Sequence, residues 1–400
     1  MKRALFTLLL LAFVLAPLPA QAQDGPRPYT IQPGDMLALI AQRFNVPADV
    51  LAQFNNISNP DLIQVGQTLL IPTPEQVDAY LAGASAHDAM VRALPRLTQG
   101  LTRASGVALA QFGFREMAIL LNRTAALLTH PADLPLPVLG LTAPDAIVQG
   151  KTEVVHVKSF TPFLPVGTFQ GRNLIFMPQS AGDDAYHYFA FLPTGALDKP
   201  GAKTLALRVG PARLERTIWI QPGIYETQHI VVPESKGDLL APDKLRAERE
   251  RLYAIWARVS GPPRWHGPFR FPIAEGFQRT SPYGTRRSYN GGPVSSFHAG
   301  SDWGAPEGTP IVAPAAGVVV LAEPLFVRGG AVIIDHGAGV YSNFWHFSRI
   351  DVKPGEVLKK GDQLGLVGTT GLSTGAHLHW EIRVNTIAVN PLQWAERTYP

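Results

Sequence analysis

One short run near the C-terminal end of this 400-residue chain constrains its fold more than any other. His377-Leu-His-Trp-Glu-Ile-Arg-Val384 alternates polar and apolar side chains at every position, which predicts a half-buried β-strand. Because side chains alternate across a strand, the four odd-numbered polar residues should share one face and line a groove. They are His377, His379, Glu381 and Arg383. The strand therefore places two imidazoles where one can bind a metal ion and the other can act as a base.

A second motif, His298-Ala-Gly-Ser-Asp302, offers an imidazole and a carboxylate four residues apart. Gly300 between them disfavours a helix and permits a bend that brings both side chains to one ion. Together with the first motif, this gives two nitrogens and one carboxylate oxygen, the ligand set of a catalytic zinc site with an open fourth position. Further imidazoles, including that of His346, are then left over for proton transfer.

Each motif alone also has a simpler interpretation. Polar pairs two residues apart are common in strands, and a single histidine is usually a hydrogen-bonded core or surface group. The metal-site hypothesis therefore depends on the joint occurrence of both motifs, with glycine-rich turns around each. His336, which ends an apolar run at a turn, is predicted to be structural.

The N-terminal residues predict export. Met1-Lys-Arg3 is basic, residues 5–16 are almost unbroken apolar, and Ala20-Gln-Ala22 is a small-residue cleavage site. We therefore assign residues 1–22 to a signal peptide and expect the protein in the cell envelope, either periplasmic or extracellular. An uncleaved anchor is the alternative, but two prolines just past the apolar run argue against it. No later stretch is long and apolar enough to span a bilayer.

Composition narrows the class of protein. The absence of cysteine excludes a disulfide framework and a thiolate metal site. Removing Lys2 and Arg3 with the signal leaves 33 basic against 31 acidic residues, a net charge of +2. That charge is enough for weak attraction to an anionic cell wall, but it does not indicate nucleic-acid binding. The 37 glycines and 36 prolines favour a multidomain, mainly β, loop-rich protein.

Residues 28–72 are predicted to form a compact unit in the order strand, helix, helix, strand. The motifs that identify it are Gln32-Pro-Gly-Asp35, Asn55-Asn56 and Val65-Gly-Gln-Thr-Leu69. This small βααβ unit resembles a LysM module, and the resemblance implies binding to glycan that contains N-acetylglucosamine. A structural unit without a ligand is the alternative.

Three segments join this unit to the C-terminal motifs. Residues 74–135 are rich in Ala and Leu at helical spacing, which predicts a helical spacer. Residues 141–232 contain short β-like runs separated by turns, which predicts an immunoglobulin-like β-sandwich without chemistry of its own. Residues 243–260 are expected to form one connecting amphipathic helix, whose charge run at 246–251 is interpreted as a solvated face.

The final segment, residues 262–396, carries five motifs in order. They are Ser281-Pro-Tyr-Gly-Thr-Arg286, Phe297-His-Ala-Gly-Ser-Asp302, Gly308-Thr-Pro-Ile-Val-Ala-Pro314, Tyr341-Ser-Asn-Phe-Trp-His346-Phe-Ser348 and Gly371-Leu-Ser-Thr-Gly-Ala-His377-Leu-His-Trp380. This segment resembles the catalytic domain of the M23 (lysostaphin/LytM-type) zinc metallopeptidases. The resemblance implies a β-rich domain with an antiparallel sheet.

By the same resemblance, His298, Asp302 and His379 bind Zn²⁺. His346 and His377 are the catalytic pair, and which of them is the general base stays open. The implied activity is hydrolysis of peptide stems or cross-bridges of peptidoglycan, with the LysM module holding the wall glycan. A catalytically inactive M23-like regulator of other cell-wall hydrolases is the alternative, but such proteins usually lose zinc ligands, and all five positions are intact here. We also expect the two ends to fold independently, so that a chain starting near Leu240 keeps its zinc.

Overall fold

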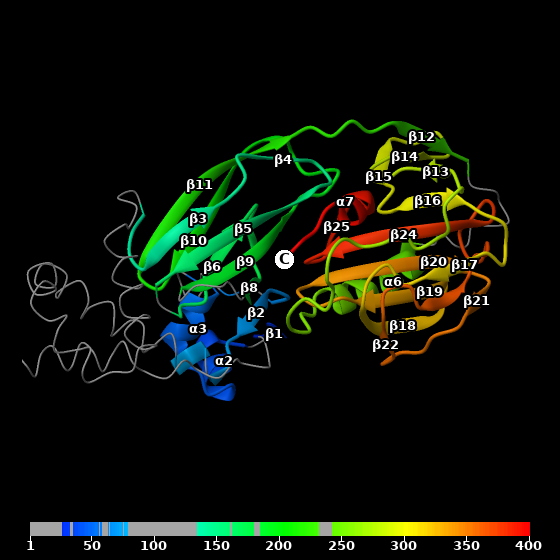
Figure 1. Ribbon diagram of the computed structural model, residues 1–400. Helices are drawn as coiled ribbons and strands as arrows, with labels where there is room; N and C mark the ends of the chain where they lie inside the picture. Colours follow the sequence, from blue (N-terminus) through cyan, green and yellow to red (C-terminus); the bar gives the residue numbers. More distant parts are fainter. Residues whose placement is uncertain are drawn as a thin grey trace, which may run out of the picture. The chain divides into compact units, whose positions relative to one another are not determined.

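Figure 1 shows the computed structural model of the chain. It describes residues 26–32, 35–55, 57, 63, 65–74, 76–78, 134–160, 162–179, 185–231 and 242–400. The predicted signal peptide (1–22) and nearly all of the predicted helical spacer (74–135) lie outside the described residues. Strands predominate in the described part, which confirms a mainly β protein. Within that part, no helix has both the length and the apolar character needed to cross a membrane.

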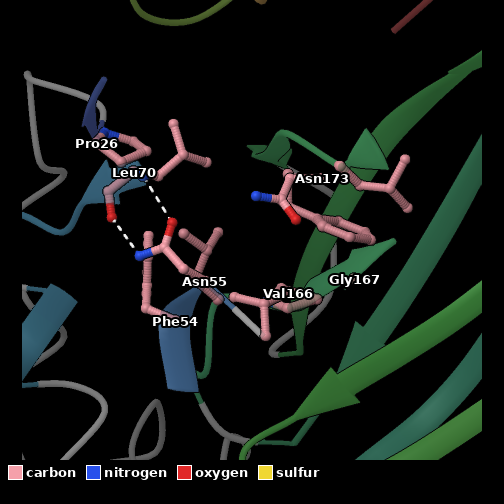
Figure 2. A pocket seen from close by; sticks show the side chains of 11 residues that line it. Pro26, Phe54, Asn55, Leu70, Val166, Gly167 and Asn173 are labelled. Atoms are coloured by element: carbon pink, nitrogen blue, oxygen red, sulfur yellow. Dashed lines mark hydrogen bonds between the residues drawn. The ribbon is translucent and has the colours of Figure 1, made fainter. Parts of the chain in front are cut away.

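The N-terminal unit has the predicted order of two helices between two strands. Its elements are β1 (Arg27–Thr30), α2 (Leu37–Arg43), α3 (Ala48–Phe54) and β2 (Thr68–Ile71). Strand β1 pairs antiparallel with β2, and the buried apolar residues of the core beneath them that the structure describes lie between Ile31 and Val77. At the end of α3, the buried Asn55 amide donates to the carbonyl of Leu70 (2.8 Å) and accepts from its N–H (2.6 Å) (Figure 2). Asn55 thereby ties the second helix to the closing strand.

The middle of the chain forms two sheets. In the four-stranded sheet the spatial order is β3 (Val138–Thr142), β5 (Thr152–Ser159), β9 (Tyr186–Pro193) and β8 (Phe176–Gln179). In the five-stranded sheet it is β4 (Ala146–Val148), β11 (Ala212–Gln221), β10 (Gly201–Val209), β6 (Val166–Phe169) and β7 (Arg172–Asn173). Buried and exposed residues alternate along much of β11, as expected for a sheet with one covered face. The immunoglobulin-like arrangement stays a prediction.

An eight-stranded sheet is the centre of the C-terminal part. Its spatial order is β13 (Arg279–Ser281), β16 (Ser301–Gly304), β24 (His377–Val384), β20 (Val340–Phe347), β19 (Gly329–Asp335), β18 (Gly317–Leu325) and β22 (Val357–Leu358), with β25 (Ile387–Val389) paired to β24. Two three-stranded sheets accompany it, made by β12 (Thr227–Ile230), β14 (Arg286–Tyr289) and β15 (Val294–Phe297), and by β17 (Pro310–Val312), β23 (Gln363–Leu366) and β21 (Arg349–Ile350). The helices are α6 (Pro242–Trp256) and α7 (Pro391–Glu396). The predicted strand at 377–384 is confirmed as β24.

Strand β24 is buried on both faces, so its prediction as half-buried is wrong. Helix α6 packs on the face that carries the polar residues. Its Trp256 Nε1 donates to Oδ1 of Asn343 (2.8 Å), the residue of β20 that lies directly opposite Glu381 of β24. Glu381 is only 2 % exposed and forms an ion pair with Arg383, whose guanidinium lies 3.9 Å from the centre of the Trp256 ring. These two residues therefore lie under the helix and do not line a groove. His377, at the other end of the strand, keeps a partly exposed side chain.

Strand β12 links the predicted sandwich segment to the C-terminal sheets. It pairs in parallel with β14, and residues 144–154, 191–203 and 217–400 form one compact unit. Within this unit the Gln393 side chain accepts from the N–H of Thr152 (2.8 Å) and donates to its carbonyl (2.9 Å). A chain starting near Leu240 would lack β12 and Thr152. These contacts argue against the expectation that such a chain folds independently, which stays a prediction.

His336 is a buried structural residue, as predicted. Its Nδ1–H donates to the carbonyl of Ala316 (2.7 Å), and its Nε2 accepts from the hydroxyl of Ser342 (2.8 Å). The tautomer follows from Ala316, because a carbonyl oxygen only accepts. Burial lowers the pKa of His336 to about 4, so the ring is neutral at neutral pH.

This burial predicts a pH-dependent stability. In the unfolded chain the pKa of histidine is about 6.5, so between pH 6.5 and 4 the unfolded state binds a proton that the folded state does not. The stability linked to His336 is therefore complete above pH 6.5 and is lost as the pH falls towards 4. Urea titrations in the presence of a chelator measure the unfolding free energy at pH 7 and at pH 4. Between these two values we expect the unfolding free energy of His336→Gln to fall by about 3 kcal/mol less than that of wild type. Parallel curves for the two proteins would contradict this.

Candidate metal centre and catalytic site

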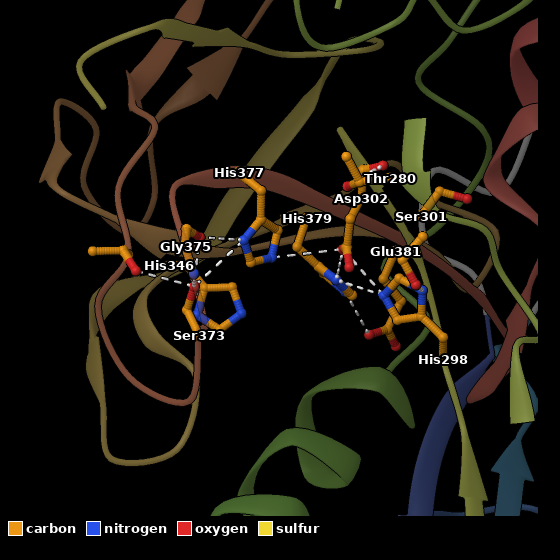
Figure 3. A network of polar contacts seen from close by, with 12 residues as sticks. Thr280, His298, Ser301, Asp302, His346, Ser373, Gly375, His377, His379 and Glu381 are labelled. Carbon is orange, nitrogen blue, oxygen red and sulfur yellow. Dashed lines mark hydrogen bonds and ion pairs between the residues drawn. The ribbon is translucent and has the colours of Figure 1, made fainter. Parts of the chain in front are cut away.

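Three polar side chains converge where β16 meets β24. Asp302 lies directly opposite His379 in the antiparallel pair, and directly opposite side chains stand on the same sheet face. His298 follows β15 and reaches the same point through the predicted bend at residues 299–300. Asp302 Oδ1 is 2.8 Å from His379 Nδ1 and 3.1 Å from His298 Nε2, and the two nitrogens are 3.1 Å apart (Figure 3).

Gly300 makes this approach possible by having no side chain. A Cβ atom there would lie 2.7 Å from His379 Nε2 and 2.4 Å from the carbonyl oxygen of Trp380. Both distances are far below van der Waals contact, so any other residue would displace the imidazole or the strand. The glycine is therefore required by space as well as by the bend.

The protonation of His298 and Asp302 suits a cation. The carbonyl of Pro282 lies 3.1 Å from His298 Nδ1, so this nitrogen donates and Nε2 presents its lone pair to the other two groups. Burial alone would raise the pKa of Asp302, but its contacts with the His298 and His379 rings hold it well below its usual range. An imidazole lone pair and an ionised carboxylate therefore face each other across a short gap.

Glu381 orients the third group. His379 Nε2 is buried without a hydrogen-bond partner among the described residues, and the nearest carboxylate oxygen, Glu381 Oε2, is 3.7 Å away. When Nε2 carries the proton towards Glu381, Nδ1 offers a lone pair to the gap. Histidines that bind metals usually donate their other N–H to a carboxylate or a backbone carbonyl. His298 does so to Pro282, and Glu381 is the carboxylate that Nε2 of His379 faces. The donor set of two nitrogens and one oxygen, all within 4.8 Å of one another, fits Zn²⁺.

His346 and His377 stand beside this cluster. The Nδ1–H of His346 donates to the carbonyl of Thr370 (2.7 Å), and that of His377 donates to Gly375 (2.8 Å). Neither Nε2 atom has a hydrogen-bond partner among the described residues, and His377 Nε2 is 3.8 Å from Asp302 Oδ1. The centroids of the two rings are 4.9 Å apart. The structure thus brings all five predicted site residues together (Figure 3).

The environment keeps His346 neutral. Burial, followed by the nearby rings of His377 and His379, lowers the pKa of His346 to about 3. The backbone of His346 has φ +68°, a left-handed conformation that residues other than glycine rarely adopt. Surrounding hydrogen bonds must hold it there, because such a conformation costs free energy.

The orienting role of Glu381 was missed from the sequence, where the residue was assigned to a groove. The alternation itself carried the signal, since a carboxylate two positions from a candidate ligand lies on the same strand face. Trp345, whose ring is stacked on His379 at a centroid distance of 6.3 Å, was also missed. Its position opposite His379 follows only from the register of β20 with β24.

Comparison with protein families identifies two segments of the chain. Residues 296–391 match the model of peptidase family M23, and residues 29–72 match the LysM domain. The first match contains all five site residues. The second coincides with the N-terminal unit from β1 to β2.

Similar curated proteins share only the C-terminal segment. An uncharacterized metalloprotease of Haemophilus influenzae is 38 % identical over 31 % of this chain and 26 % of its own length. A DD-carboxypeptidase/endopeptidase, Mpg, of Neisseria meningitidis is 42 % identical over 25 % of this chain and 23 % of its own length. The peptidoglycan DD-endopeptidase ShyA of Vibrio cholerae is 34 % identical over 31 % of this chain and 29 % of its own length. The chain thus matches less than a third of each relative. On the two family matches, it contains a LysM domain and a peptidase domain of family M23.

Proposed function

We propose that this protein is an exported, zinc-dependent endopeptidase that hydrolyses peptide stems or cross-bridges of peptidoglycan, anchored to wall glycan by its LysM domain. The observation that carries the proposal is the convergence of His298 Nε2, Asp302 Oδ1 and His379 Nδ1 beside two imidazoles with free Nε2 atoms. Relatives named as metalloprotease and peptidoglycan endopeptidase support both the metal and the substrate.

The roles of the five site residues follow from which of their nitrogen and oxygen atoms face the site. His298, Asp302 and His379 would hold the zinc ion, which when bound supplies an acidified water and polarises the scissile carbonyl. His346 and His377 have their Nδ1 protons committed to backbone carbonyls, so each can take up or deliver a proton only at Nε2. One ring accepts the proton of the attacking water at Nε2 and delivers it to the leaving amine. The other ring stabilises the oxyanion when it carries a proton on Nε2 as well as on Nδ1. No covalent enzyme intermediate is needed.

The cell envelope is the location that these domains support. A LysM domain and relatives named as peptidoglycan endopeptidases both point to the wall. Export through the predicted signal at residues 1–22 completes the proposal, because peptidoglycan lies outside the cytoplasm.

An inactive regulator of other wall hydrolases is the rival function. Inactive relatives usually lose metal ligands, whereas here the three ligand candidates and both imidazoles are present and close together. A direct test is digestion of purified sacculi with added zinc or with chelator, followed by mass spectrometry of the released muropeptides. Zinc-dependent release of peptide-cleaved products supports the peptidase, and unchanged sacculi under all conditions support the regulator.

Removing the LysM domain should separate wall binding from catalysis. Among the described residues, the buried members of this domain's core lie between Ile31 and Val77, and a chain starting at Leu134 keeps β12 and the rest of the C-terminal unit. We expect it to retain zinc and to cut soluble stem peptides at the full-length rate. Its activity on intact sacculi should fall on the order of tenfold or more, because the second binding contact is lost. Equal activity of both forms on sacculi would show that LysM is not the anchor.

A further inference from the structure

Glu248 of helix α6 is a charged residue on a buried face. The helix directs Leu252 and Trp256 towards the sheet, and Glu248 falls on the same stripe, four residues before Leu252. It is only 7 % exposed, so the interpretation of residues 246–251 as a wholly solvated face is wrong at this position. A buried carboxylate needs partners, and an acidic residue on an apolar stripe was the signal that the sequence offered.

Both oxygens of Glu248 bind the turn between β18 and β19. Oε2 accepts from the N–H of Val327 (2.8 Å), and Oε1 accepts from Arg328 Nη1 (2.5 Å). The Glu248 side chain is 5 % exposed and that of Arg328 is 25 % exposed, so the ion pair is largely shielded from water. Removing one partner of such a pair is costly because the other is left unpaired. The helix therefore fixes the conformation of residues 327–328.

The same turn supports His346 from two sides. The carbonyl of Arg328 accepts from the N–H of His346 (3.0 Å), which has the strained backbone with φ +68°. The carbonyl of Val327 accepts from the N–H of Leu372 (2.7 Å), two residues after Thr370. Thr370 in turn supplies the carbonyl that holds the His346 ring. Both the backbone and the imidazole of His346 therefore depend on residues that Glu248 holds.

A second set of contacts leads from Arg328 to the metal cluster. The Arg328 guanidinium lies over the ring of Trp345 at 5.2 Å, and Trp345 is stacked on His379. Arg328 thus forms an ion pair with Glu248, its guanidinium lies over the ring of Trp345, and its carbonyl accepts from the N–H of His346. A shift of this one residue would move groups on both sides of the site.

We propose that Glu248 is a positioning residue for His346, acting through Val327 and Arg328. Glu248 lies outside the segment that matches the M23 family, residues 296–391, so the inference assigns to a preceding helix a part in assembling the site. The inference rests on the proposed hydrolytic function for its kinetic readout alone. The geometry of His346 can be measured without any substrate.

The kinetic test compares Glu248→Ala and Glu248→Gln with Glu250→Ala, an exposed acid on the same helix. All are assayed as zinc-loaded full-length protein, at least ten degrees below the unfolding midpoint of each variant. We expect Glu248→Ala to lower kcat on the order of tenfold or more with little change in KM, since small misplacements of a reacting group are expensive. Glu248→Gln keeps an acceptor for the N–H of Val327, so its kcat should lie between those of Glu248→Ala and wild type. Glu250→Ala should match wild type. Zinc stoichiometry should be equal in all four proteins.

The structural test is amide hydrogen exchange measured by NMR. The N–H of His346 should exchange on the order of tenfold faster in both Glu248 variants, because its acceptor on Arg328 is no longer held. A purely structural role in the stability of α6 would lower the unfolding midpoint without a selective change at His346. Folded Glu248 variants with wild-type kcat and wild-type exchange at His346 would overturn the proposal. If Glu248→Ala does not fold, Glu248→Gln decides the matter on the same criteria. If wild type itself hydrolyses nothing, the proposed function fails and the exchange rates still decide the positioning role.

Discussion

Asp302→Ala should lose bound zinc and wall hydrolysis together. Asp302 Oδ1 is the atom on which His298 and His379 both converge, at 3.1 and 2.8 Å. Without it, two nitrogens face each other with no negative charge between them, too few ligands to hold the ion in a catalytic arrangement. Metal content after dialysis against a zinc buffer, and release of soluble product from sacculi, measure the two losses. His379→Ala should behave in the same way.

Asp351→Ala is the matched control for this change. Asp351 is an exposed carboxylate bound to Arg349 on the surface of the same domain, at 2.6 and 2.9 Å. Its removal deletes the same charge from the chain without touching the site, so zinc content and activity should stay at wild-type values. Stoichiometric zinc and full activity in Asp302→Ala would disprove the ligand assignment.

The sequence predicted those parts of the site that depend on local pattern. The alternation at 377–384 predicted strand β24, and Gly300 predicted the bend that turns His298 towards Asp302. That Asp302 and His379 share a point in space depends on a strand pairing across 77 residues, which no local pattern specifies. The two motifs together suggested one metal site, and the family resemblance named these three residues as its ligands.

The two errors about burial have one physical cause: another element packs on the polar face of a locally amphipathic strand or helix. Strand β24 has the alternation of a half-exposed strand, yet α6 packs on its polar face, and Glu381 and Arg383 pair with each other beneath it. Glu248 has the sequence environment of a solvated face, yet its partners lie about eighty residues away. Buried ion pairs replace apolar contacts at these positions, so hydropathy alone assigns them to solvent.

His346→Ala should keep the zinc and the fold but lose hydrolysis by on the order of a hundredfold or more. The His346 ring is outside the converging ligand set, with its centroid 6.3 Å from that of His379. Its Nδ1 is committed to Thr370, so the only group that it adds to the site is Nε2. Deleting the ring removes a proton carrier and leaves the three ligand atoms in place.

The backbone of His346 calls for a second variant. Alanine at φ +68° carries a conformational cost of about 1 kcal/mol, whereas asparagine tolerates this region. His346→Asn should therefore be the more stable of the two variants and still lose activity to a similar extent, because it also lacks the imidazole. Metal analysis, thermal unfolding and sacculus digestion of both variants separate the ring from the backbone. If activity and zinc were lost together in His346→Asn, His346 would be a ligand, and the proposed division between metal-binding and proton-transferring histidines would have to be reversed.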